Sequence, residues 1–457
     1  MTAAENLIEL PPLVPSNTAS LSGGRAPVRT EADEDGPFTI AGVVPPVLNG
    51  QLLLLGPNPM WVDDVDSHHS DDGDGMVHAI SLSEGRPTST RSRFVRTRTL
   101  ARRWGAQAPP GPLNLAGPLA NRSVVLVAGR LLALDGRGFG YRLATGLDTA
   151  LVEDFETMLS TTMGSCVVVD PPTGRSTFLG SGFRGPDGLV LTELGADGII
   201  GRTTPLPLPY QPDDPPIEVL DDLVAIGLGS HALTWRSEEH TGDPNLVFDL
   251  ERPSAIGLLP RGGTSGDVRW CSTVPGVFTA FISLIASGTG ADGVVLRRDP
   301  SPGDDGAWRP ERTGGWLASF QADTRMQSLR LEALDDLELL GVAIDPVAAP
   351  DLRRYAYGVT ADHSVIIKYN FRSGSTTRTE LPEHLLAGHP LFWRDPEGRS
   401  DEEGWLLVPC LDRTTHCTAL MIFDATRTAA EPEAIIGMPT RIPLDAKGLF
   451  LPRAQGR

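Results

Sequence analysis

The sequence predicts an all-β protein, either a β-propeller or a large β-sandwich, and three observations support this. Apolar runs of strand length recur along most of the 457 residues, each bounded by Gly, Pro or Asp. Gly and Pro are abundant, at 50 and 40 residues, and they supply the backbone angles that tight turns need. The runs do not alternate with helical segments, as they would in a fold of parallel strands and crossover helices.

The strand-like runs follow one another from residue 51 onward. They cover residues 51–59, 76–85, 123–138, 165–182, 188–198, 246–253, 255–263, 278–288, 364–374, 404–412 and 418–427. Residues 123–134 and 365–379 have the pattern of β-hairpins, and helical periodicity is confined to 148–162 and 381–387. No repeat of about 40 residues is visible, so periodicity alone does not decide between propeller and sandwich.

The chain divides into two parts by composition. Residues 1–36 are rich in Pro, Ser and acidic side chains and predict an irregular N-terminal arm, whereas residues 37–457 contain no linker and predict a single domain. The N-terminus has neither the basic nor the apolar region of a signal peptide, and no apolar stretch is long enough to span a membrane. The four cysteines form no CxxC pair, which fits a reducing compartment. We therefore expect a cytoplasmic protein.

The negative net charge limits the classes of molecule that the protein is expected to bind. The formal net charge is −19, which repels phosphate backbones and argues against a nucleic-acid partner. It also argues against binding to anionic lipid through charge, although peripheral membrane contact through an apolar patch is left open. The sequence does not indicate an oligomeric state.

Several motifs resemble one known family. They are GQLLLLGPNPM at residues 50–60, DGDGMVHAI at 72–80, SRFVRTRTL at 92–100, NRSVVLVAGRLLALDGRG at 121–138, VVVDPPTG at 167–174, FDLERPSAIGLLPRGG at 248–263, RRYAYG at 353–358, DEEGWLL at 401–407 and LMIFDA at 420–425. Their order and spacing resemble those of the carotenoid cleavage oxygenases, the family that includes the retinal pigment epithelial membrane protein. The resemblance implies a seven-bladed β-propeller, with loops and short helices that cap a hydrophobic tunnel.

The resemblance also implies an iron site from which this sequence departs. In the family, four histidines from four blades bind Fe(II) at the propeller axis, and outer carboxylates orient them. Aligning the motifs places Cys166, Gly229, Thr279 and Lys447 at the four histidine positions. The positions of the supporting glutamates are occupied by Gly136, Leu340 and His389. We therefore expect no iron and no other cofactor, with Mg²⁺ required only for a diphosphate substrate.

An acidic stretch is the first candidate for catalysis. Residues 63–74 read DDVDSHHSDDGD, which is more acidic than the family's motif. Clustered carboxylates such as Asp71, Asp72 and Asp74 either keep one acid protonated, so that it protonates an alkene, or bind Mg²⁺. The alternative is an Asp-rich loop that faces solvent.

Lys447 and Cys166 are the other catalytic candidates. A desolvated lysine serves as a base or Schiff-base former, or neutralises an anionic group of the substrate; the alternative is a lysine that reaches solvent or pairs with Asp445. The Cys166 thiol is a nucleophile if Lys447 lowers its pKa, and otherwise a small core residue.

Five further residues are assigned to substrate binding. They are Thr279, Gly229, His231, Trp61 and His69. His231 is also the second iron ligand if the alignment shifts in register, but the segment from His231 to His240 favours an exposed loop. His78, in the GDGMVHA motif, is interpreted as structural.

Two classes of function follow. In the first, the protein is an enzyme that isomerises or cyclises a terpenoid or another polyene by acid–base chemistry in an apolar tunnel, without a metal. In the second, it is a pseudoenzyme that binds a hydrophobic small molecule. An oxygenase with a relocated metal site is the remaining alternative.

Overall fold

The computed structural model describes residues 21–62, 73–114, 119–182, 188–234, 245–299 and 314–453. Within these ranges the protein is built almost wholly of β-strands, and α1 (Arg98–Arg103) is the one α-helix that they contain. Three short 3-10 helices, η2 (Gly23–Arg25), η3 (Ser265–Asp267) and η4 (Ala425–Arg427), complete the set. The all-β prediction is confirmed, and in the described residues no helix is long and apolar enough to cross a membrane.

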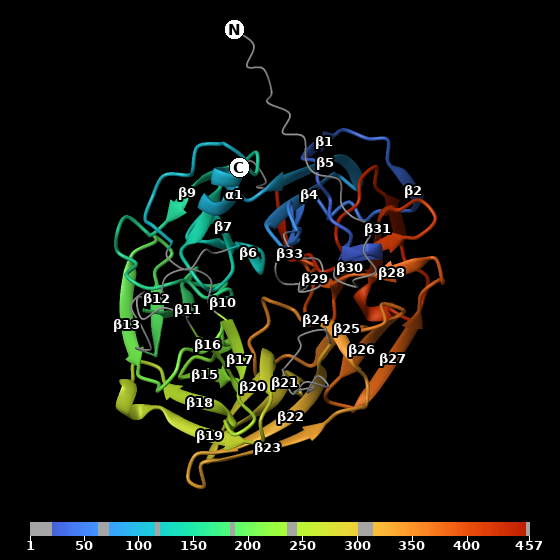
Figure 1. Ribbon diagram of the computed structural model, residues 1–457. Helices are drawn as coiled ribbons and strands as arrows, with labels where there is room; N and C mark the ends of the chain where they lie inside the picture. The colour runs from blue at the N-terminus through green and yellow to red at the C-terminus, as the bar shows by residue number, and fades with distance from the viewer. Residues whose placement is uncertain are drawn as a thin grey trace.

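The sheets succeed one another around a ring (Figure 1). The first contains, in spatial order, β1 (Ala32–Glu34), β5 (Arg86–Phe94), β4 (Gly75–Ser83), β3 (Gly50–Pro57) and β33 (Lys447–Pro452). The second contains β6 (Ser123–Val127), β7 (Arg130–Leu134), β8 (Gly140–Leu143) and β9 (Thr149–Glu153). The third contains β10 (Val167–Val169), β11 (Ser176–Ser181), β12 (Leu189–Leu194) and β13 (Ile200–Leu206).

The other half of the ring is less regular. An eight-stranded sheet runs in the order β14 (Ile217–Val219), β15 (Leu223–Leu228), β18 (Ser254–Pro260), β19 (Arg269–Thr273), β23 (Ser328–Ala333), β22 (Trp316–Asp323), β21 (Gly290–Arg298) and β20 (Val277–Ser287). A separate hairpin pairs β16 (His231–Thr234) with β17 (Asn245–Phe248). A four-stranded sheet contains β24 (Leu339–Ala343), β25 (Tyr355–Thr360), β26 (Val365–Asn370) and β27 (Ser375–Glu380). The last sheet contains β2 (Thr39–Gly42), β32 (Ala434–Gly437), β31 (Cys417–Asp424), β30 (Gly404–Asp412) and β28 (Leu385–Ala387), and β29 (Leu391–Arg394) also pairs with β30.

This arrangement is propeller-like, but the expected count of seven separate blades is not met. Among the described strands, five sheets have the four to six strands of a blade. The difference arises because β14–β15–β18–β19 and β20–β23 are joined into one sheet by a single parallel pair, Ser272 with Ser328. Blade-sized units therefore merge where their outer strands meet.

Local predictions are confirmed in part. The hairpins expected at 123–134 and 365–379 are β6–β7 and β26–β27. The helices expected near 148–162 and 381–387 are wrong, because β9 and β28 occupy these segments and pair with neighbouring strands. The arm expected to be irregular up to residue 36 contributes β1, which pairs with β5. The division into an arm and one propeller domain stays a prediction.

The apolar runs are explained by cores on both faces of a strand. In β3, Leu53 and Leu55 pack into the core shared with β6 and β7, while Leu52 and Leu54 pack into the core shared with β30–β32. Successive side chains of a strand point to opposite faces, so a strand between two neighbouring sheets is apolar at every position. This is why residues 52–55 read as an unbroken leucine run.

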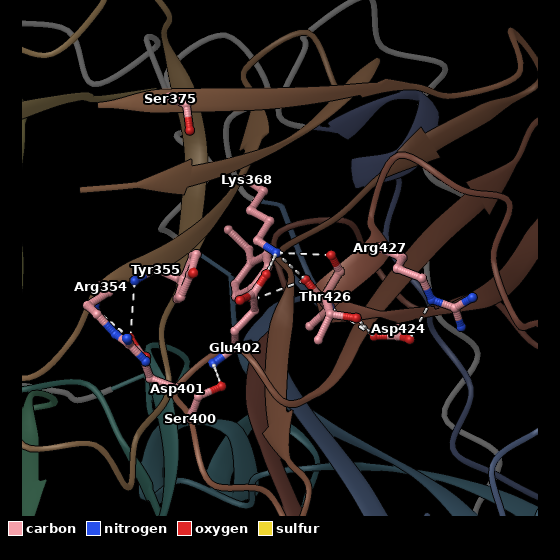
Figure 2. Close-up of polar contacts among 12 residues, drawn as sticks. Arg354, Tyr355, Lys368, Ser375, Ser400, Asp401, Glu402, Asp424, Thr426 and Arg427 are labelled. Atoms are coloured by element: carbon pink, nitrogen blue, oxygen red, sulfur yellow. Dashed lines mark hydrogen bonds and ion pairs between the residues drawn. The ribbon is translucent and has the colours of Figure 1, made fainter. Parts of the chain in front are cut away.

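A buried lysine links the sheet of β24–β27 to the sheet of β28–β32 (Figure 2). Lys368 of β26 is 7% exposed; its ammonium bonds to Glu402 and donates to the carbonyl oxygens of Ala425, at 2.8 Å, and Thr426, at 3.3 Å. The ammonium also lies over the ring of Tyr355, 5.0 Å from its centroid. All three ammonium hydrogens have acceptors, so the buried charge is compensated.

We expect Lys368→Met to destabilise the fold by about 3 kcal/mol, because it removes the ammonium that bonds to Glu402 and to the carbonyls of Ala425 and Thr426. The measurement is urea unfolding followed by tryptophan fluorescence. The matched control, Arg378→Met on the exposed face of neighbouring β27, should change stability by less than about 0.5 kcal/mol. Equal effects of the two substitutions would contradict this account.

Candidate functional site

Three of the four residues aligned with iron ligands lie at the inner ends of sheets. Cys166 directly precedes β10, Thr279 is in β20, and Lys447 begins β33. Each of these strands is the last of a hydrogen-bonded series, and all three lie toward the centre of the ring (Figure 1). The structure thus gathers segments that are far apart in sequence around one axis.

Gly229 does not share this position. It follows β15, the second strand of its series, whereas β14 is the inner strand. A Cβ at Gly229 would lie 2.5 Å from Nδ1 of His231, so the glycine makes room for this imidazole. The residues that precede the inner strand, as Cys166 precedes β10, are Asp213 to Pro216.

The side chains at these inner ends do not fit ferrous iron. Desolvation raises the pKa of the Cys166 thiol to about 12, and the neighbouring Asp214 and Glu218 add to the effect, so the thiol is protonated at neutral pH. The Thr279 hydroxyl donates to the carbonyl of Leu296 at 3.2 Å, and Lys447 brings a positive charge. In the part of the chain that the structure describes, no three His, Cys, Asp or Glu side chains lie together as a metal site requires. The assignment of these positions to the family's iron ligands stays a prediction.

Two adjacent carboxylates are buried at the inner end of β14. The Asp213 and Asp214 side chains are 5% and 7% exposed. Arg122, before β6, donates to Asp213 at 2.8 Å and to Asp214 at 3.4 Å. Arg137, between β7 and β8, donates to Asp213 at 3.1 Å. The pair therefore connects the inner ends of two sheets.

The two carboxyls have opposite pKa shifts. Burial opposes ionisation of Asp213, but the guanidinium groups of Arg122 and Arg137 outweigh it and hold its pKa well below the ordinary value. For Asp214 burial prevails and raises the pKa, and the charge of Asp213 adds to the effect. Two neighbouring carboxyls with pKa values moved apart are a common arrangement for acid–base chemistry.

His231 lies beside this pair. Its Nε2 is 3.2 Å from the backbone oxygen of Asp213, while Nδ1 has no hydrogen-bond partner. The residue is 8% exposed, and burial lowers its pKa, so the imidazole is neutral near pH 7. The segment is strand β16 rather than the expected exposed loop, because it pairs with β17; residues 235–244 lie outside the described residues.

Lys447 and Arg298 lie close enough to His389 to affect its pKa. The Lys447 side chain is exposed, and Asp445 forms an ion pair with Arg25 at 2.7 Å. Burial lowers the pKa of His389 well below its ordinary value, and the charges of Lys447 and Arg298 lower it further. His389 is therefore neutral.

The other predicted residues lie elsewhere. Trp61 packs edge-on against Trp104, with centroids 6.3 Å apart, in a small core beside α1. Asp74 accepts a hydrogen bond from the backbone N–H of Met60 at 3.0 Å and so ties the segment after β3 to the segment before β4. His78 is buried, bonds to Ser92 at 2.7 Å and has a pKa lowered to about 3 by burial, which agrees with a structural role. His69, Asp71 and Asp72 lie outside the described residues.

The sequence and the fold both match those of known proteins. The family model of the retinal pigment epithelial membrane protein matches residues 25–284 and 310–452. The chain belongs to this family. A carotenoid cleavage oxygenase of Mycobacterium tuberculosis is 26% identical over 501 residues, covering 96% of this chain and 98% of the relative. A carotenoid 9,10(9',10')-cleavage dioxygenase 1 of Arabidopsis thaliana is 23% identical, covering 95% and 90%.

Solved structures agree on the fold. A lignostilbene dioxygenase of Pseudomonas brassicacearum superposes with a TM-score of 0.84 at 20% identity, covering 96% of this chain and all of that one. A cobalt-substituted apocarotenoid oxygenase of Synechocystis superposes with a TM-score of 0.78 at 22% identity, covering 93% and 97%. The propeller expected from the sequence motifs is therefore the fold of known oxygenases.

These comparisons correct the expectation of a protein without cofactors. The relatives are named as oxygenases and dioxygenases, and one solved relative holds a substituted metal. The prediction that neither iron nor another cofactor is used is thus contradicted by the family to which the chain belongs. In the part of the chain that the structure describes, the side chains at the inner strand ends nonetheless do not match an iron site.

The sequence did not indicate the buried pair Asp213 and Asp214 at the inner end of β14. Asp213 and Asp214 appear in the sequence as part of QPDDPP, which reads as a turn. Two signals could have indicated them: they come shortly before the short strand β14, and a Pro-Pro pair restricts the backbone between them and that strand. Their partners Arg122 and Arg137 belong to another sheet, so the sequence around Asp213 does not indicate these contacts.

We expect Cys166 to resist alkylation by iodoacetamide at pH 8, because a thiol with a pKa of about 12 has almost no reactive thiolate there. Peptide mass spectrometry should find it unmodified in the native protein and modified after unfolding in urea. Rapid modification of the native protein would instead indicate the nucleophilic thiol considered above.

Proposed function

We propose that this protein isomerises or cyclises an elongated apolar alkene of the terpenoid or polyene class by transferring protons. The named substrates of its relatives, carotenoids, apocarotenoids and lignostilbene, are conjugated alkenes. The observation that carries the proposal is the set of side chains at the inner strand ends. Lys447 and the Asp213–Asp214 pair carry exchangeable protons at these ends.

The reaction class balances without a further reactant. Protonation of one alkene carbon forms a C–H bond and leaves a carbocation on the other carbon. Loss of a proton from a neighbouring carbon gives an isomer, and attack by a second double bond before that loss gives a ring. The proton returns to the protein, so the product has the composition of the substrate. The protein contributes a proton donor, a proton acceptor and a fixed conformation of the chain.

A second candidate is non-catalytic binding of the same class of molecule. Two observations favour it: the Cys166 thiol is protonated, and the Thr279 hydroxyl is already bonded to the Leu296 carbonyl. Both groups would then only line the binding site.

The experiment is incubation of the purified protein with lycopene, and separately with geranylgeranyl diphosphate, with and without oxygen, after its metal content has been measured. We expect a product of unchanged mass that forms at the same rate without oxygen. Binding without a product would favour the second candidate. Shortened, oxygen-containing products with oxygen uptake would contradict both and indicate an oxygenase with a relocated metal site.

A further inference from the structure

The connection between β24 and β25 is long for its place in the fold. It covers residues 344–354, which is eleven residues, and we call this segment the far-end loop. The connections that follow other inner strands have two, six, three and two residues; they are β6–β7, β10–β11, β14–β15 and β20–β21. Hairpin connections usually have about two to five residues, and much longer loops commonly have a function of their own.

The far-end loop bonds to the free edge of β20. Among the described strands β20 pairs with β21 alone, so its other edge faces the centre of the ring (Figure 1). On that edge the backbone N–H of Leu284 donates to the Pro350 carbonyl at 3.3 Å. The Ile282 carbonyl accepts a hydrogen bond from Arg353, also at 3.3 Å. The loop therefore lies at the centre of the ring, beside residues 282–284.

Buried charges hold the loop on two sides. The guanidinium of Arg353 forms an ion pair with Glu218 of β14, and the two side chains are 8% and 6% exposed. It also donates to the carbonyl of Ala348, within the loop, at 3.2 Å. Near the start of the loop, the Asp345 side chain is 1% exposed and forms an ion pair with Arg394 of β29 at 3.0 Å. The loop is thus attached to strands of two other sheets.

Exposure along β20 changes where the loop lies. Thr279 and Ala280, near the start of the strand, are half-buried, whereas Ser283 is 5% exposed. Beyond the loop, Ile285 is 47% exposed. A strand rises about 3.3 Å per residue, so the loop meets β20 roughly 15 Å from Thr279. Solvent therefore reaches β20 on both sides of the loop, and Lys447 is exposed at the end where Thr279 lies.

We propose that the far-end loop is a stopper, which closes the centre of the ring roughly 15 Å beyond Thr279. A molecule then enters at the end of the ring where Cys166, Thr279 and Lys447 lie, and it extends no further than the pair of Arg353 and Glu218. Closure of the ring follows from the contacts of the loop, whereas the selection of substrates by their length rests on the proposed function. A chain that is longer than this space leaves its remaining carbons outside.

Closure is tested without a substrate, by alkylation of an introduced cysteine. In Ser283→Cys the thiol lies between the two β20 residues that bond the loop, so iodoacetamide should modify it slowly at pH 8. Adding Arg353→Ala removes the guanidinium that pairs with Glu218, and we expect the modification to become at least about 10-fold faster. Peptide mass spectrometry separates residue 283 from the native cysteines.

The matched control is Arg130→Ala, which removes the cation of another partly buried ion pair, with Glu153 in the second sheet. It should change the rate of modification by less than about 2-fold, because it lies far from the loop. Equal acceleration by the two substitutions, or none by Arg353→Ala, would overturn the stopper. If Arg353→Ala does not fold, Asp345→Asn takes its place with the same expected result, because it weakens the pairing with Arg394.

The limit on length is tested with linear isoprenoid alcohols, namely geraniol, farnesol, geranylgeraniol and solanesol. Their affinities are measured by the quenching of tryptophan fluorescence. In the wild type we expect the affinity to rise with each isoprene unit up to one length and then to stop rising. In Arg353→Ala the next alcohol of the series should bind at least about 10-fold more tightly than the last, because more apolar surface is buried.

The same limiting length in the wild type and in Arg353→Ala would overturn selection by the stopper. If none of the alcohols binds while the alkylation experiment shows closure, the proposed function is contradicted and the closure of the ring stands. The two failures are therefore distinguishable.

Discussion

The pairing of β33 with β3 is the interaction on which the rest of the ring depends. Residues 447–452 form an antiparallel ladder with residues 50–55, so the two strands that meet lie at opposite ends of the described chain. The entropy cost of closing so long a loop grows only with the logarithm of its length, and a six-residue ladder with two apolar faces offsets it. The same closure places Lys447 at the inner edge beside Leu55.

A second strand pairing also closes the ring between the N-terminal and C-terminal parts of the chain. β2 pairs with β32, so the N-terminal segment also completes the last sheet, and η2 contacts the following loop through Arg25 and Asp445. Neighbouring sheets are then fixed to one another by apolar cores and by buried ions such as Lys368. Because the sheets cannot shift independently, their inner ends keep a constant arrangement, which a site assembled from several sheets requires.

The sequence predicted an all-β, propeller-like fold, but not the number of separate sheets or the arrangement of the candidate site. Continuous apolar strands such as residues 52–55, and motifs in a fixed order, are local signals, and they predicted the propeller. Gly229 was placed by counting from Thr234, and the structure shows that this counting selects the second strand rather than the inner one. The acidic stretch was selected for its composition, and for its last member, Asp74, the structure records a hydrogen bond from the backbone N–H of Met60. Asp213 and Asp214 became visible only when another sheet brought Arg122 and Arg137 to them.

The late position of β33 in the chain has a consequence for biosynthesis. Until residues 447–452 have left the ribosome, the inner edge of β3 has unpaired N–H and C=O groups beside an apolar strand. Such an edge readily pairs with strands of other chains. Nascent molecules therefore pass through an interval in which self-association competes with ring closure, and slow translation of the segment between β3 and β33 would lengthen it.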